Sequence, residues 1–216
     1  MARIVRIGCL AGLLAAGWCA RPADAALSAS DVTQRVQRQY GTIRSVSADF
    51  VQTSRLGPTN QSGQVKGRIL LKKQNKVRVE MGGQVIVSDG KSVWVYVPEN
   101  QQVLVSRADR RRGGMRPDDF LFYYSSQYAP TLVGEETLDG VPHYILRLIS
   151  KESGADVQEL RVWVDSKQWC TRKVVYTDAT GSTVTIMFSN IRLNPPLPDA
   201  TFVLPIPKGV EVVDLR

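Results

Sequence analysis

The stretch QVIVSDGKSVWVYVPENQQVLV, residues 84–105, decides the fold because it predicts three consecutive antiparallel strands. Asp89-Gly90 predicts a hairpin turn, since glycine tolerates positive φ and the aspartate side chain hydrogen-bonds the turn backbone. Pro98 fixes φ at the start of the second turn. In the strand between the turns, Trp94 and Tyr96 share one face and three valines share the other. Both faces are apolar, so we expect apolar groups to cover each side of this part of the sheet.

One long helix is predicted near the start of the chain. Ser28 provides a hydroxyl group suited to capping the first turn. Val32, Val36 and Tyr40 follow at a spacing of four residues and form one apolar stripe on a helix. Gly41 then ends the pattern.

Most of the remaining chain reads as strands and turns. Beyond residues 84–105, the predicted strands are 46–52, 64–72, 76–81, 131–138, 143–149, 157–164, 169–177 and 182–193. A basic loop, Arg107–Arg116, and a short aromatic helix, residues 118–124, divide this series. Prolines at 195, 196 and 198 end the sheet before an extended tail. The order of elements predicts a mostly β fold, with an antiparallel curved sheet or barrel covered by helices.

The first 25 residues predict an exported protein. Arg3 and Arg6 precede an apolar run, and Ala23-Asp24-Ala25 is typical of a signal-peptidase site, so we expect cleavage after Ala25. Residues 26–216 then form a single domain. Removing three arginines (Arg3, Arg6 and Arg21) and Asp24 lowers the net charge from +8 to about +6, which weakly favours anionic surfaces.

The residue types of common active sites are missing or isolated. His143 is the only histidine, and a lone histidine on a strand is usually a structural or surface residue, so we expect neither a Ser-His-Asp triad nor a histidine-based zinc site. Cys170, the one cysteine left after cleavage, lies next to Trp169 in a predicted strand, so we expect a buried and unreactive thiol. Asp118-Asp119 reads as a helix cap rather than as a catalytic pair. No phosphate-binding loop is present, so we expect no enzyme activity, cofactor or metal, and export argues against nucleic-acid binding.

Four segments together resemble the family of periplasmic outer-membrane lipoprotein carriers, LolA. They are Ser47–Gln52 (SADFVQ), Gly67–Lys73 (GRILLKK), Val87–Tyr96 (VSDGKSVWVY) and the tail residues Phe202 and Pro207–Val210 (PKGV). The resemblance covers nearly all of residues 26–216. It implies an unclosed antiparallel β-barrel, or strongly curved sheet, whose open face is covered by an N-terminal helix and by short helices that form a lid. It also implies an apolar cavity between them.

The resemblance further implies the function, the location and the partners. We expect a soluble, monomeric periplasmic chaperone that carries lipoproteins from the inner to the outer membrane. Its partners would be acylated lipoproteins, an inner-membrane lipoprotein-releasing transporter and an outer-membrane acceptor. A carrier of other lipids or glycolipids, a regulatory sensor module of this fold, and the membrane-anchored acceptor itself remain as alternatives.

Candidate site residues follow from the strand pattern and from the resemblance. We expect one apolar face of the sheet to line the cavity, and Phe120, Leu121 and Phe122 to belong to the lid. The cavity candidates are Leu70, Val77, Val79, Trp94 and Tyr96. In the family, a basic residue after the Gly67 strand, usually Arg followed by Pro, hydrogen-bonds the lid backbone. Lys73 followed by Gln74 occupies that place here, and its ammonium group lacks the planar fork of arginine.

Overall fold

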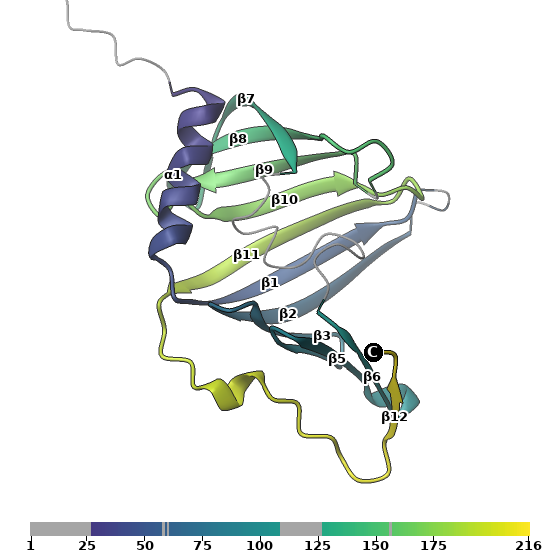
Figure 1. Cartoon of the computed structure of the whole chain (residues 1–216). Coiled ribbons are helices and arrows are strands. Elements are labelled where there is room, and N and C mark those ends of the chain that lie inside the picture. Colours follow the sequence, from purple (N-terminus) through teal and green to yellow (C-terminus); the bar gives the residue numbers. More distant parts are fainter. Residues whose placement is uncertain (1–26, 58, 60, 109–126, 156) are drawn as a thin grey trace, which may run out of the picture.

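The described part of the chain folds around one open twelve-stranded sheet with the strand order β12-β6-β5-β4-β3-β2-β1-β11-β10-β9-β8-β7 (Figure 1). This computed structural model describes residues 27–57, 59, 61–108, 127–155 and 157–216. Its elements are α1 (Ala29–Thr42), β1 (Ser45–Arg55), β2 (Ser62–Lys72), β3 (Lys76–Met81), β4 (Gln84–Asp89), β5 (Ser92–Val97), η1 (Pro98–Asn100), β6 (Gln102–Arg107), β7 (Tyr128–Leu138), β8 (Val141–Ser150), β9 (Glu159–Asp165), β10 (Thr171–Thr177), β11 (Thr183–Leu193), η3 (Asp199–Phe202) and β12 (Glu211–Asp214). The predicted class, a mostly β fold with an unclosed curved sheet and an N-terminal helix, is confirmed. The predicted signal peptide and the short aromatic helix lie outside the described residues.

Helix α1 begins at the predicted cap. The Ser28 hydroxyl accepts a hydrogen bond from the backbone N–H of Asp31, whose carboxylate accepts one from the Ser28 backbone N–H in return. Val32 and Val36 are buried, so the predicted apolar stripe faces the protein interior. Among the described residues, no helix is long and apolar enough to cross a membrane.

Strand register assigns every sheet side chain to one of two faces. On β1, Val46, Ala48 and Phe50 pack in the same cluster as Val32 and Val36 of α1. We call this side of the sheet the helix face and the opposite side the outer face. Because directly paired residues share a face, the helix face can be followed from β1 to both edges of the sheet.

The three antiparallel strands predicted in residues 84–105 form as β4, β5 and β6. Gly90 has a φ of +94°, and a Cβ atom there would collide with the carbonyl oxygen of Gln74. The Asp89 carboxylate accepts hydrogen bonds from the backbone N–H groups of Lys91 and Ser92, each 2.8 Å long. Turn chemistry and a close approach between two hairpins therefore fix this turn.

The C-terminal tail, residues 194–210 (yellow in Figure 1), contacts β3 and β4 through η3. The Lys72 ammonium donates to the carbonyl oxygen of Leu197 at 2.7 Å, and the Arg78 guanidinium donates to that of Thr201 at 3.3 Å. Phe202 is buried, as are the outer-face valines Val87, Val103 and Val105. The second apolar face of residues 84–105 is thus partly buried in a small outer-face core, separate from the main one.

Candidate functional site

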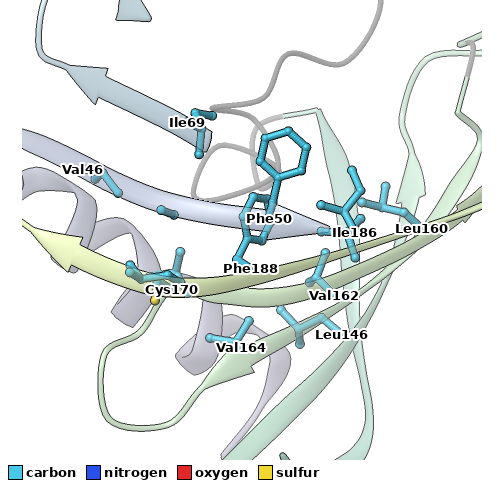
Figure 2. Close-up of a cluster of buried hydrophobic side chains, with 14 of the residues drawn as sticks. Val46, Phe50, Ile69, Leu146, Leu160, Val162, Val164, Cys170, Ile186 and Phe188 are labelled. Atoms are coloured by element: carbon cyan, nitrogen blue, oxygen red, sulfur yellow. The ribbon is translucent and has the colours of Figure 1, made fainter. Parts of the chain in front are cut away.

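The helix face forms one continuous apolar cluster from β3 to β8. Leu146, Leu148 and Val162 are completely buried, and Figure 2 shows Leu146 and Val162 near Ile186. These side chains come from adjacent antiparallel strands, where alternating residues point to the same side. The contacts within such a cluster are non-directional, so the surface is suited to apolar ligands of variable shape.

Two phenylalanines lie near the middle of this face. Phe50 on β1 pairs with Phe188 on β11, and their ring centroids are 6.3 Å apart at an interplanar angle of 58° (Figure 2). On its other side Phe50 pairs with Gly67 of β2. A Cβ atom at Gly67 would collide with the Phe50 ring and with the carbonyl oxygen of Glu80. Glycine is therefore required there to make room for the aromatic ring.

Helix α1 is held against this face by aromatic contacts as well as by its buried valines. The Arg35 guanidinium carbon lies 4.8 Å from the ring centroid of Trp169, in the β9–β10 turn. The Trp169 ring in turn stacks on Tyr144 of β8, with centroids 5.7 Å apart and planes 9° apart. These three side chains connect the helix through the turn to the sheet.

A pocket of about 90 Å³ opens where the end of α1 meets the β2–β3 turn. Tyr40, Ile43, Val46, Leu71 and Val77 supply its apolar lining. On its own it is much smaller than the roughly 300–1,000 Å³ of typical small-molecule sites. It therefore marks an end of the helix face rather than a complete binding site.

Lys73 lines this pocket and joins the β2–β3 turn to α1. Its ammonium group donates a hydrogen bond to the carbonyl oxygen of Gly41, 3.2 Å away, and its backbone N–H donates to the carbonyl oxygen of Arg44. The last turn of α1 contains no basic residue. Lys73 thus provides a positive charge at the negative end of the helix dipole.

The two residues considered for chemistry are both buried. His143 Nδ1 lies 2.7 Å from the carbonyl oxygen of Val141, and Nε2 has no hydrogen-bond partner in the described part of the chain. The predicted burial of Cys170 is confirmed. Burial raises the pKa of its thiol to about 12, which disfavours the nucleophilic thiolate form. Among the described residues, no group of three or more acidic, histidine or cysteine side chains is placed to hold a metal ion.

Comparison with known proteins assigns this fold to a family. The family model described as "Outer membrane lipoprotein carrier protein LolA" matches residues 41–205. The chain belongs to the LolA family. The match includes every strand from β1 to β11, and so includes the sheet side of the helix face.

Relatives of the LolA-family chain are distant in sequence. The outer-membrane lipoprotein carrier protein of Dechloromonas aromatica is 29% identical over 181 residues, covering 79% of this chain and 81% of that protein. An uncharacterized protein of Methanocaldococcus jannaschii is 26% identical over 190 residues, and this chain spans only 54% of its length. A conserved protein of Thermus thermophilus has a solved structure with a TM-score of 0.60 at 18% identity, covering 86% of this chain and 98% of that one. That structure supports the fold alone.

The predicted cavity residues do not share a face of the LolA-type sheet, and this corrects the sequence analysis. Val77 and Val79 lie on the helix face. Register places Leu70, Trp94 and Tyr96 on the outer face, because Leu70 pairs with Arg78 and Trp94 pairs with Val87. The prediction of one common cavity face was therefore wrong. Alternation shows that a strand has two faces but does not identify which one is covered by the helix.

Other candidates are placed in part or not at all. Lys73 contacts helix backbone, as the LolA resemblance implies, while its closing role stays a prediction. Phe120, Leu121 and Phe122 lie outside the described residues, as does most of the basic loop Arg107–Arg116.

Sequence reasoning missed the stack of Arg35, Trp169 and Tyr144. Trp169 adopts a φ of +51°, which is rare for a bulky residue, and no sequence pattern signals it. Arg35 lies three residues after Val32 and one before Val36, so its place beside the apolar stripe was available from helical spacing. Its aromatic partner, Trp169, could not be predicted in this way, because it lies 134 positions later in the chain.

Proposed function

We propose that this protein is a soluble periplasmic chaperone that binds the acyl chains of lipoproteins and carries them from the inner to the outer membrane. The observation that carries the proposal is the continuous apolar helix face beneath α1. Membership of the LolA family and the lipoprotein-carrier names of its relatives support it. The acyl chains would lie between the helix face and its cover.

The physical requirement of such a carrier matches this surface. Each buried CH₂ group is worth ~0.8 kcal/mol, so one acyl chain exposed to water costs on the order of 10 kcal/mol. A carrier must shield that surface and still release it to an acceptor. Aliphatic and aromatic side chains give affinity without directional bonds, which suits chains that must leave again.

The proposed cycle contains no chemical step, so the protein acts without enzymatic activity or a cofactor. An inner-membrane transporter would load it and an outer-membrane acceptor would unload it. Transfer would then follow a gradient of affinity between the three partners, because the carrier itself supplies no energy.

Photo-crosslinking with a lipopeptide tests where acyl chains bind. The full chain is exposed to a diacylated lipopeptide that carries a diazirine in one acyl chain, irradiated, and digested for mass spectrometry. We expect labels on helix-face residues such as Phe50 and Phe188. Labels concentrated on Trp94 and Tyr96, on the outer face, would overturn the assignment of the site to the helix face.

Recovery of the native cargo tests the identity of the ligand. A tagged full chain is isolated from the periplasm, and co-purifying molecules are analysed for acylated N-terminal cysteine peptides and for free lipids. Lipoproteins as the major species are expected. Free lipids or glycolipids alone would support the alternative carrier function and would contradict lipoprotein transport.

A further inference from the structure

The geometry points to a clasp, formed by Arg35, Trp169 and Tyr144, that holds α1 on the helix face and controls how fast acyl chains are taken up beneath it. The uptake part of this inference rests on the proposed function. The mechanical part, that these three residues hold the helix, stands on the contacts alone.

The clasp connects three separate segments of the chain. Arg35 comes from α1, Trp169 from the β9–β10 turn and Tyr144 from β8. The guanidinium lies over one ring, and the second ring is nearly parallel to the first. Cations are attracted to the electron-rich face of an indole, and indole stacks favourably on phenol. The helix is therefore bound to the sheet by interactions that need a defined orientation of each group.

The turn fixes Trp169 in the orientation that the clasp needs. The Asp165 carboxylate accepts hydrogen bonds from the backbone N–H groups of Lys167 and Gln168, at 2.7 and 2.8 Å. The Trp169 backbone N–H donates to the carbonyl oxygen of Asp165 at 2.9 Å. These bonds hold Trp169 at its φ of +51°, a left-handed conformation that an aromatic residue rarely adopts. The indole is thus presented to α1 by a rigid support.

Exposure distinguishes the clasp from the permanent core. Val32 and Val36 are completely buried, or nearly so, whereas Arg35, Trp169 and Tyr144 are each half-buried. A half-buried guanidinium exchanges its ring contact for water more easily than a buried valine leaves the core. Acyl chains that reach the side chains under α1 must displace the helix. Opening of the clasp is the step that this displacement requires.

The chain offers a matched control for this contact. Lys173 on β10 lies over the ring of Trp163 on β9, with its ammonium 4.1 Å from the centroid, and register places both on the outer face. Arg35→Gln and Lys173→Gln each remove one positive charge and one cation–π contact. Only the first removes a contact with α1. Arg38→Gln changes an exposed arginine of the same helix and controls for helix charge.

Hydrogen–deuterium exchange of the α1 amides tests the mechanical part without any ligand. Arg35→Gln should increase their exchange roughly two- to fivefold, the factor that corresponds to loss of a cation–π contact worth about 0.5–1 kcal/mol, while Lys173→Gln and Arg38→Gln leave it unchanged. Trp169→Phe should give a smaller increase than Arg35→Gln. Equal α1 exchange in Arg35→Gln and Lys173→Gln would overturn the clasp.

Stopped-flow uptake of a fluorescent long-chain fatty acid tests the functional part. Arg35→Gln should take up the probe faster than the unmodified chain by a factor similar to that seen in exchange. Faster exchange with unchanged uptake would overturn control of loading by the clasp. Faster exchange with no probe binding to any form, the unmodified chain included, would contradict the proposed function and leave the mechanical role of the clasp supported.

Discussion

The Lys73 ammonium and the Gly41 carbonyl oxygen lie 3.2 Å apart, and their hydrogen bond joins the β2–β3 turn to the last turn of α1. Lys73→Ala should remove this bond and raise hydrogen exchange at residues 40–43. Because Lys73 is exposed, the free energy of unfolding should fall by less than about 1 kcal/mol. Lys73→Arg, which can still donate, should resemble the unmodified chain. If Lys73→Ala left both hydrogen exchange and lipopeptide release unchanged, a role of Lys73 in closing the cavity would be contradicted.

Gly67 makes room for the Phe50 ring, so Gly67→Ala should destabilise the fold. The added methyl group meets the ring and the backbone of Glu80, and overpacking of this kind costs about 1–3 kcal/mol. Urea unfolding measures the loss. Gly63→Ala in the same strand is the control, because a Cβ atom there meets nothing within 4 Å. Equal stability of the two variants would show that the packing of Phe50 over Gly67 is not required.

Phe202 anchors the C-terminal tail, and Phe202→Ala should reduce stability by about 3–5 kcal/mol as a large buried ring is lost. Val203→Ala, the next residue and 61% exposed, should change stability by less than about 0.5 kcal/mol. Since the tail lies on the outer face, Phe202→Ala that remains folded should still bind acyl probes. Loss of binding in the folded variant would instead link the outer face to the ligand.

Asp199 gives the tail attachment a defined pH dependence. Hydrogen bonds from Lys72 and, to a smaller extent, Lys76 lower the pKa of its carboxyl group to about 2. In the unfolded chain the pKa returns to about 3.9, so the ion pairs stabilise the fold above about pH 4 and cease to do so as the pH falls towards 2. The difference in unfolding free energy between the unmodified chain and Asp199→Asn should therefore shrink over that interval. An undiminished difference in unfolding free energy at pH 2 would show that it does not arise from the ion pairs of Asp199.

Local chemistry made most of the fold predictable. The Ser28 cap, the Asp89-Gly90 turn and the three prolines after residue 194 act over a few residues, and each of them appears in the structure as expected. The predicted bounds of β3 agree with the structure at both ends, and most other strands differ by a few residues. Such signals are independent of what packs against the element.

The site was less predictable because it depends on distant partners. Trp94 is on the outer face because it pairs with Val87, and the segment around Phe202, more than 100 residues later, contacts β3 and β4. Both faces of its strand are apolar, so periodicity had no polar side by which to orient it. Trp169 depends on a backbone conformation that its own residue type disfavours. In each case tertiary contacts decide between options that the local sequence leaves equal.

The two edges of the sheet bear on whether copies of this protein aggregate. At one edge β12 pairs in parallel with β6, so the last residues of the chain occupy a backbone edge that would otherwise be open to another strand. At the other edge β7 contains Pro130 and a register irregularity between Leu132 and Gly134, both of which discourage strand addition. Truncation before Glu211 would therefore leave the backbone edge of β6 open to pairing with a strand of another molecule.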